Sequence, residues 1–386
     1  MRYAERLNRL PPYLFAELDR KVEEKRRQGV DIISFGVGDP DMPTPEHIVR
    51  AACEAAGKPE NHRYPSYEGK LSYRQAVAER FERDFGVKLD PEREVIALIG
   101  SKEGVHNIHF AFVDPGDVVL CPCPAYPVYR TGTLFAGGVP EILPLRAERG
   151  FLPDLWEVPE KRLRRARMLW INYPNNPTAA VAELDFYREV VDFAEEHGLI
   201  VCSDEAYASI AFDGYRVRSF LEAEGAMEVG VVINSLSKTY SMTGWRIAYA
   251  CGSEEVIEGL KKVKTNVDSG ASGIIQDAAI AALTGPQDCV REAVAEYQRR
   301  RDALVEGLRR LGFSVDKPKA TFYLWLRVPG GDSMAFAERL LEVGVVVTPG
   351  VGFGEHGEGY VRFALTQPVE RIREAVERME EAGLAE

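Results

Sequence analysis

The stretch VGVVINSLSKTYSMTGWRIAYA, residues 229–250, holds the features that decide both the fold and the chemistry. It begins with an apolar run without alternation, which is typical of a strand buried on both faces of a sheet. Hydroxyl side chains then surround Lys238, and Arg246 follows in the same stretch. A lysine at a strand end is usually solvated or snorkelling, so its position between Ser237 and Thr239 needs an explanation.

Similar apolar runs recur along the chain and alternate with helical patterns. The runs are REVIALIG, DVVLC, ARMLWIN, LIVC and VVIN. Strands that alternate with helices build parallel sheets. The pattern over residues 46–285 therefore predicts a large α/β domain with a mostly parallel sheet wrapped in helices. Residues 286–386 predict a smaller α+β domain, in which a long charged helix precedes the short strands FSV, TFYLWLRV, VVVTP and YVRFAL and a last helix. Residues 1–45 are expected to form an arm and part of the small domain.

The length, net charge and cysteine content of the chain limit the classes of protein to which it can belong. The 386 residues exceed the ~250–300 at which one core stops growing, which favours two domains. A net charge of −12 disfavours nucleic acid or an anionic membrane as a partner. No apolar run of ~18 residues and no apolar leader is present, so a cytoplasmic location is expected. The six cysteines do not form a disulfide framework, and Cys121 and Cys123 are expected to be plain thiols.

Three patterns resemble ligand sites and are better explained as structure. GVGDPD (36–41) and GFGEHG (352–357) look like dinucleotide fingerprints, but neither opens a helix that could receive a pyrophosphate. His106 and His109 lie three residues apart on a predicted helix without a third ligand nearby. The sequence therefore predicts neither a nicotinamide cofactor nor a metal.

Polar groups gather at four predicted strand ends. IGSKEGV offers backbone N–H groups at 101–103 for a phosphate, although Ser101 could equally be a simple helix cap. YPNNPTAA offers an amide, LIVCSDEAY offers Asp204 and Tyr207, and the opening stretch offers Lys238 and Arg246. Ligands of parallel sheets bind at these ends. An amine, a phosphate site and a carboxylate for a pyridinium nitrogen together predict pyridoxal 5′-phosphate as the cofactor.

The residues of these segments resemble a known family. SLSKTYSMTGWR, PNNPT, DEAY and the arginine of YVRFAL are similar to the fold-type-I, class I and II aminotransferases over nearly the whole chain. HRYPSYEG, LIGSKEG, DSGAS, KATFY and GFGEHGEGYVRFALT resemble the bacterial LL-diaminopimelate aminotransferases within that family. The resemblance implies a mixed, mostly parallel seven-stranded sheet and a homodimer with active sites shared between subunits. It also implies transfer of an amino group between an L-amino acid, most simply LL-diaminopimelate, and 2-oxoglutarate.

The resemblance assigns roles to residues. Lys238, Asp204 and Tyr207 would be catalytic, with Lys238 bonded to the cofactor and Asp204 paired with its ring nitrogen. The implied cofactor-binding set also contains Ser101, Lys102, Glu103, Tyr126, Asn176, Ser235, Ser237, Arg246 and, from the neighbouring subunit, Tyr64. The implied substrate-binding set is Tyr13, Gly38, Asn176, Ser269 and Arg362, with Arg362 on the α-carboxylate.

Some positions depart from the family pattern. Ala179 stands where the family has glycine, so the turn is expected to avoid positive φ there. Ser203, Ser241 and Ala248 also differ from the commoner residues. Aspartate, alanine and aromatic aminotransferases and C–S lyases share the cofactor residues and remain alternatives. A ligand-sensing module is disfavoured because no DNA-binding segment precedes the domain.

Overall fold

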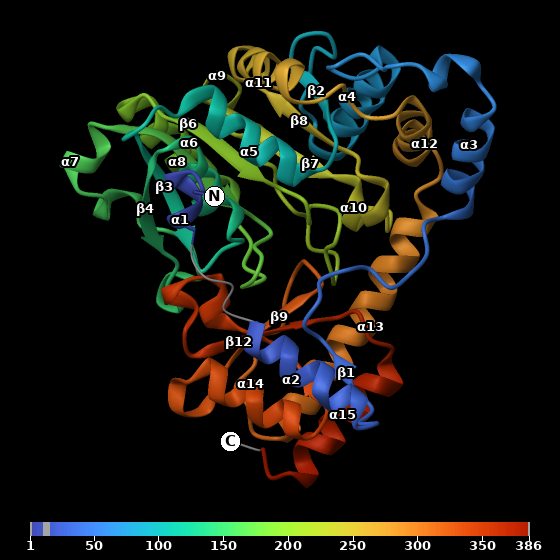
Figure 1. The fold of residues 1–386 in the computed structure, drawn as a ribbon, viewed down its shortest axis with the longest axis vertical. Helices are drawn as coiled ribbons and strands as arrows, with labels where there is room; N and C mark the ends of the chain where they lie inside the picture. The colour runs from blue at the N-terminus through green and yellow to red at the C-terminus, as the bar shows by residue number, and fades with distance from the viewer. Residues whose placement is uncertain (1, 11–15, 385–386) are drawn as a thin grey trace.

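A seven-stranded sheet forms the centre of the larger part of the molecule, shown at the top of Figure 1. The computed structural model describes residues 2–10 and 16–384. All strands run parallel except β8, which is antiparallel to both of its neighbours. The strand order is β2 (Val95–Leu98), β8 (Ala248–Gly252), β7 (Gly230–Ser235), β6 (Ile200–Asp204), β5 (Ala166–Asn172), β3 (Val118–Cys123) and β4 (Val139–Pro144).

Successive residues of each central strand pack into different cores. In β5, Leu169 and Ile171 belong to one buried cluster, whereas Met168 and Trp170 belong to another. Side chains alternate between the faces of a sheet, so both faces are apolar and must be covered. This is why the sequence shows continuous apolar runs instead of alternation.

Helices cover both faces of this sheet (Figure 1). The cluster that contains Leu169 is closed by α3 (Glu46–Ala56), α4 (Leu71–Phe85), α8 (Leu184–His197) and α12 (Gly273–Thr284). The cluster that contains Trp170 is closed by α5 (Ser101–Phe112), α6 (Val128–Ala136) and α11 (Glu254–Val267). Shorter helices are α7 (Glu160–Leu163), α9 (Ala226–Val229) and α10 (Leu236–Thr239). The predicted mostly parallel sheet wrapped in helices is confirmed.

The smaller part is an α+β unit with a core of its own. Its antiparallel sheet has the order β11 (Thr348–Pro349), β12 (Tyr360–Ala364) and β9 (Tyr323–Arg327), and β1 (Ile33–Ser34) pairs in parallel with β10 (Val345–Val346). Its helices are α13 (Asp288–Arg310), α14 (Ser333–Glu342) and α15 (Val369–Glu381). Ile210 and Phe212 pack into this core although they follow β6. The boundaries at residues 45 and 285 therefore stay a proposed division.

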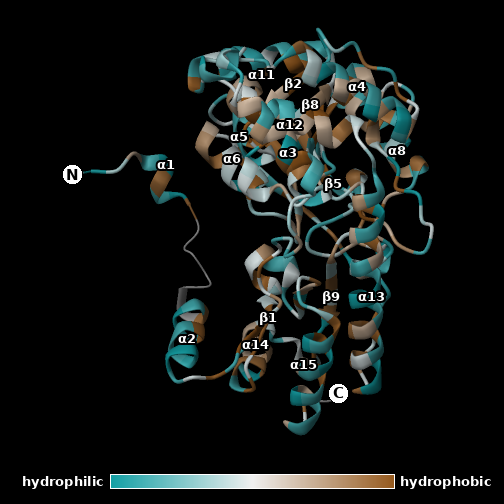
Figure 2. Cartoon of the chain, turned by 90° about the vertical axis from the view of Figure 1, so that its right-hand side faces the viewer, coloured by the Kyte–Doolittle hydropathy of each residue, from teal (hydrophilic) through white to brown (hydrophobic). Residues whose placement is uncertain are grey.

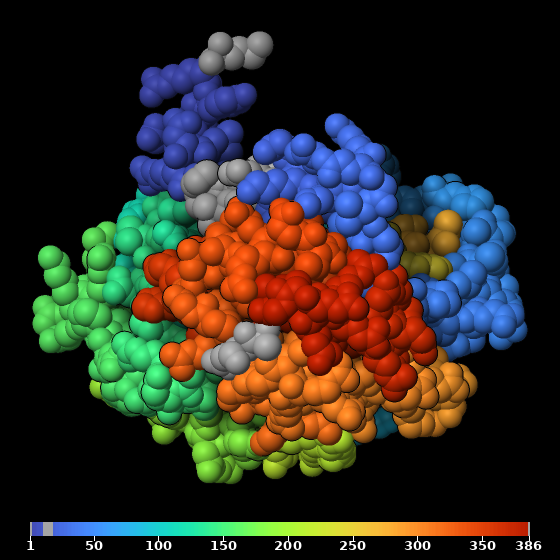
Figure 3. Space-filling model, turned by 90° about the horizontal axis from the view of Figure 1, so that it is seen from below, coloured from blue at the N-terminus to red at the C-terminus, as the bar shows by residue number. Residues whose placement is uncertain are grey.

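The N-terminal segment contributes two more helices. Helix α2 (Ala16–Arg27) is fastened to α14 by Lys21–Glu338 and Lys25–Glu342 ion pairs of 2.8 and 2.6 Å. Helix α1 (Glu5–Asn8) buries none of its residues; it projects at the side of the molecule in Figures 2 and 3 and contacts α6. Within the described part of the chain, no helix combines the length and the apolar character that a membrane span requires.

Three expectations about strands need correction. FSV (313–315) is not a strand, because the Val315 carbonyl accepts from the Arg309 guanidinium at 2.7 Å instead of from a ladder. The run VVVTP divides between β10 and β11, which lie in different sheets. Strands β4 and β8 were not predicted; β4 carries two prolines and lies at the sheet edge, where prolines are tolerated.

Candidate active site

A cavity of about 830 Å³ lies where the carboxyl ends of β5, β6 and β7 face β9 and β12 of the smaller unit. Twelve of the predicted site residues line it, although they are scattered through the sequence. They are Gly38, Ser101, Lys102, Tyr126, Asn176, Asp204, Tyr207, Ser235, Ser237, Lys238, Arg246 and Arg362. The parallel sheet therefore brings most of the expected site together.

Lys238 lies in the short helix α10, directly after β7. Its Nζ donates a hydrogen bond to the Gly38 carbonyl oxygen at 2.6 Å. The pKa of this amine is lowered to about 8, chiefly by burial; Asp39 raises the pKa, and Arg362 and Arg246 lower it. The neutral amine is therefore well populated near pH 8, which suits a nucleophile or a base.

Asp204 and Glu205 are adjacent in sequence, and the sheet separates them. Alternation along β6 places Asp204 on the cavity side, where the Tyr129 hydroxyl donates to its Oδ2 at 2.7 Å. Glu205 is bound instead by the Ser203 hydroxyl and the Phe220 N–H, both at 2.9 Å. Burial raises the pKa of Asp204, while the hydrogen bond from Tyr129 lowers it. Of these two acids, only Asp204 lines the cavity and can pair with a ligand there.

Arg362, on β12, is held in a fixed plane. Its Nη1 donates to Asn176 Oδ1 at 2.7 Å and its Nη2 to the Gly36 carbonyl at 2.9 Å. The guanidinium lies over the rings of Tyr323 and Phe353, at 4.2 and 4.7 Å from their centroids. Its buried Nε has no hydrogen-bond partner among the described residues. A planar, oriented guanidinium is the group that binds a carboxylate bidentately.

An anion cradle lies at the N-terminus of α5. Gly100 precedes this helix with φ +118°, and a Cβ there would come within 2.2 Å of Arg246 Nη2. Glycine is thus required for the arginine to approach the backbone beside the unpaired N–H groups of Ser101 and Lys102. Gly100, not Ser101, is the N-cap, and no side chain caps the helix. A phosphate would meet N–H donors and a guanidinium here.

Known proteins were compared with the chain. The family model described as Aminotransferase class I and II matches residues 30–379. The LL-diaminopimelate aminotransferase of Moorella thermoacetica is 56% identical over 98% of both chains. The substrate-bound BacF structure from Bacillus subtilis is 37% identical, with a TM-score of 0.94 over 99% of this chain and 98% of that one. A Thermus thermophilus aspartate aminotransferase mutant is 35% identical, with a TM-score of 0.90 over 99% of this chain and 100% of that one.

The chain belongs to the class I and II aminotransferases. It is therefore an enzyme that transfers an amino group, on the fold that the resemblance implied. The predicted family is confirmed. The roles of individual residues rest on the geometry described above.

Three described residues of the predicted site, Glu103, Ser269 and Tyr64, do not line the cavity of this aminotransferase. The Glu103 carboxylate accepts from the Ile99 N–H at 3.1 Å, and its own N–H donates to the Gly100 carbonyl at 3.2 Å. Ser269 is exposed at the surface. Tyr64 is 89% exposed. Tyr13 lies outside the described residues.

The cavity also contains residues that the sequence did not single out. Tyr323 donates to or accepts from the Tyr207 hydroxyl at 2.9 Å, and its ring supports Arg362. A Cβ on Gly38 would lie 2.0 Å from the Tyr323 hydroxyl, so glycine is needed at that position. Tyr323 is the last residue of KATFY, a stretch that resembles the subgroup, and this is the signal in the sequence that points to it.

The residues rejected as metal ligands have structural partners. His109 is buried in α5, where its Nδ1 donates to the Val105 carbonyl at 2.6 Å. Nδ1 of His106 lies 2.9 Å from the Lys102 carbonyl. Across the described chain, no group of three or more His, Cys, Asp or Glu residues is arranged to hold a metal ion.

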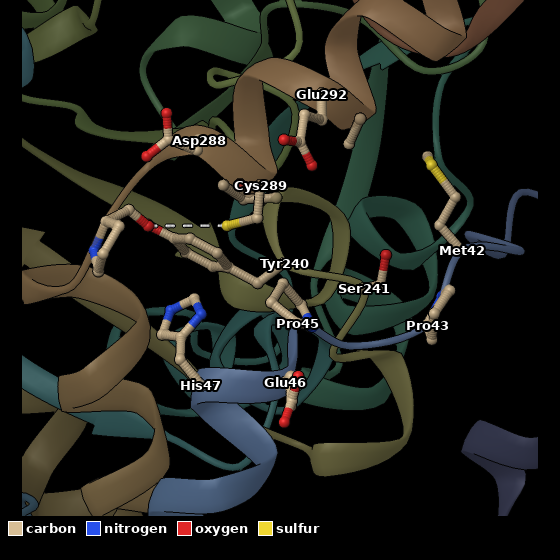
Figure 4. A pocket seen from close by; sticks show the side chains of 13 residues that line it. Met42, Pro43, Pro45, Glu46, His47, Tyr240, Ser241, Asp288, Cys289 and Glu292 are labelled. Atoms are coloured by element: carbon tan, nitrogen blue, oxygen red, sulfur yellow. Dashed lines mark hydrogen bonds between the residues drawn. The ribbon is translucent and has the colours of Figure 1, made fainter.

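A second hollow lies beside the segment that follows Lys238 in the sequence (Figure 4). It is lined by residues of three segments: 42–47, 239–241 and 286–293. The first and third are the chain crossings between the two parts of the molecule. None of the predicted site residues lines this hollow, so the cavity at the strand ends is the candidate active site.

The expectation about Ala179 is wrong. Ala179 has φ +59°, the left-handed conformation that its side chain was expected to exclude. The surrounding turn imposes this conformation: the Ala179 N–H donates to the Asn175 carbonyl at 2.9 Å, and Asn175 Oδ1 accepts from the Thr178 hydroxyl at 2.7 Å. The turn thus keeps the shape that glycine would allow and presents Asn176 to the cavity.

We expect Ala179→Gly to raise the free energy of unfolding by up to about 1 kcal/mol. Glycine removes the steric cost of holding an L-residue in the left-handed conformation, which is about 1–2 kcal/mol. This gain exceeds the free energy lost because glycine gives the unfolded chain more conformational entropy, which is about 0.4–1 kcal/mol. Ala179→Val should lower stability by about 2 kcal/mol, because a β-branched side chain is least tolerant of positive φ. Urea denaturation measures the free energy of unfolding of both variants.

Ala78→Gly in α4 is the control, and it should lower the free energy of unfolding by about 1 kcal/mol. An equal loss of stability in Ala179→Gly would contradict the assigned turn.

Proposed function

We propose that this aminotransferase binds pyridoxal 5′-phosphate in the cavity and transfers an amino group between LL-diaminopimelate and 2-oxoglutarate. The observation that carries the proposal is the convergence of Lys238, Asp204 and Arg362 on one cavity. These groups come from strand ends and from the smaller unit. The donor is proposed from the 56% identity to an enzyme named LL-diaminopimelate aminotransferase.

The residues present fit the cofactor. The cradle that a Cβ on Gly100 would fill lets Arg246 and the N–H groups of Ser101 and Lys102 receive the phosphate. Asp204 lies on the cavity side of β6 for the ring nitrogen, and Tyr207 and Asn176 offer donors for the phenolic oxygen. When bound, the cofactor supplies an aldehyde for the amino group and a ring that withdraws electrons.

Lys238 would serve as both the attachment point and the base. With a pKa lowered to about 8, its Nζ is neutral often enough to attack a carbonyl carbon or to remove a proton from the substrate Cα. The Gly38 carbonyl orients the amine through its 2.6 Å hydrogen bond. The segment around Gly38 therefore contributes to the chemistry through its backbone.

Arg362 would hold the substrate α-carboxylate. Tyr323 and Phe353 flank its guanidinium, so little side-chain entropy is lost when a carboxylate binds. Asn176 connects this arginine with the cofactor side of the cavity through a 2.7 Å hydrogen bond. The small and large units thus contribute to one substrate site.

Tyr64 supports a proposed homodimer. Its side chain is 89% exposed and does not line the cavity of its own subunit. A role toward the phosphate, as the family resemblance implies, requires that it reach a neighbouring copy. We therefore propose that active sites are shared between two subunits.

A donor screen tests the proposed function. We expect LL-diaminopimelate to give the highest kcat/KM with 2-oxoglutarate, measured as glutamate formed by enzyme reconstituted with the cofactor. Lys238→Ala should lose more than about a hundredfold in kcat, because positioned proton transfer contributes about 10²–10⁴-fold. Preference for aspartate, alanine or an aromatic donor would contradict the assigned substrate. Release of ammonia and pyruvate would indicate a C–S lyase.

The depressed pKa of Lys238 gives a second test in the apoenzyme. Only the neutral amine attacks an aldehyde, so the rate constant for cofactor uptake should rise with pH and level off above a midpoint near 8. Arg362→Gln should move this midpoint upward, because it removes a cation that disfavours the charged amine. The rate constant for the reaction of the cofactor with free Nα-acetyl-lysine is measured over the same pH range. It corrects for the ionisation of the cofactor itself. A midpoint near the ordinary lysine value of ~10.4 would show that the amine is not desolvated.

A further inference from the structure

A buried tyrosine, Tyr129 on α6, is hydrogen-bonded to the carboxylate of the proposed active site. Its hydroxyl donates to Asp204 Oδ2 at 2.7 Å, and both residues are buried. The other oxygen, Oδ1, accepts from the Ala206 N–H at 3.2 Å. Each carboxylate oxygen thus has one protein donor and keeps further lone pairs for a ligand.

The ring of Tyr129 is fixed by a stack of aromatic side chains. It lies parallel to Trp170, with centroids 4.8 Å apart and an interplanar angle of 17°. Trp170 in turn stacks on His109 at 5.4 Å, and its indole N–H donates to His109 Nε2 at 3.1 Å. Because an indole nitrogen only donates, His109 must carry its hydrogen on Nδ1, which donates to the Val105 carbonyl. The tyrosine therefore has little freedom to turn away from Asp204.

The hydrogen bond acts on the charge state of Asp204. Burial raises the pKa of this carboxyl, so that alone it would tend toward the neutral acid. Burial also raises the pKa of Tyr129 well above its usual value, so the phenol stays protonated and remains a donor. Burial lowers the pKa of His109 to about 4, so this ring adds no positive charge nearby. Tyr129 and the Ala206 N–H are both neutral donors that favour the ionised carboxylate, and Tyr129 has the larger effect of the two.

We propose that Tyr129 is a positioning residue that keeps Asp204 ionised, so that the proton shared with the ring nitrogen of bound cofactor stays on the nitrogen. This rests on the proposed function, since it assumes that Asp204 faces that nitrogen. Without the hydroxyl, the equilibrium would shift toward the form in which the proton lies on an Asp204 oxygen and both groups are neutral. The total number of protons does not change.

Nitrogen NMR of enzyme loaded with ¹⁵N-ring-labelled pyridoxal 5′-phosphate tests the proposal. The shift of this nitrogen reports whether it carries a proton, independently of turnover. Tyr129→Phe should change the ratio of the two proton positions by about tenfold to a hundredfold toward Asp204, as expected for the loss of a hydrogen bond to a charged group. Tyr73→Phe is the matched control, since Tyr73 is fully buried and donates to a backbone carbonyl, that of Ala248, at 3.1 Å. It should leave the nitrogen shift unchanged.

Further variants separate the outcomes. Trp170→Phe keeps the Tyr129 hydroxyl but removes the bond to His109, and should move the shift in the same direction by a smaller amount. In an Asp204→Asn background, Tyr129→Phe should have no further effect on the ring nitrogen. An unchanged shift in Tyr129→Phe, or an equal further change in the Asp204→Asn background, would overturn the proposal. A wild-type enzyme that does not take up the labelled cofactor would contradict the proposed function instead.

Discussion

The desolvation of the Lys238 amine is the constraint on which the rest of the cavity depends. A buried amine needs an acceptor, and the Gly38 carbonyl supplies one at 2.6 Å. That contact joins the N-terminal segment to the end of β7, a separation of 200 residues. Two arginines further disfavour the charged form, and they also provide the anion sites. One electrostatic environment therefore makes the amine reactive and attracts acidic ligands.

The parallel sheet supplies the geometry for this environment. Alternation along β5 and β6 puts Trp170 and Asp204 on the same face, with Glu205 on the other. The apolar residues of that face are closed by α5 and α6, which bring the anion cradle and Tyr129 with them. Arg362 comes from β12 of the smaller unit, so its distance from Lys238 depends on how the two parts of the molecule pack. Strength of substrate binding should thus be sensitive to the crossings at 42–47 and 286–293.

Much of the fold and site followed from local sequence patterns, and the failures have physical causes. The strands that end at Asn172, Asp204 and Ser235 were predictable because both of their faces are apolar. The Tyr129–Asp204 and Tyr207–Tyr323 hydrogen bonds span 75 and 116 residues, so no local pattern reveals them. Residues 313–315 have strand-like composition, but a hydrogen bond from Arg309, six residues before Val315, takes the carbonyl that a ladder would use. At Ala179 the hydrogen bonds of the turn outweighed the steric preference of the side chain.

The account rests on Lys238 as the residue that bonds to the cofactor. The most direct measurement is borohydride reduction of the loaded enzyme, followed by proteolysis and mass spectrometry. We predict that the pyridoxyl phosphate mass is found on the peptide that contains Lys238. Its recovery on a peptide with a different lysine, or the absence of any labelled peptide from loaded enzyme, would contradict the assignment.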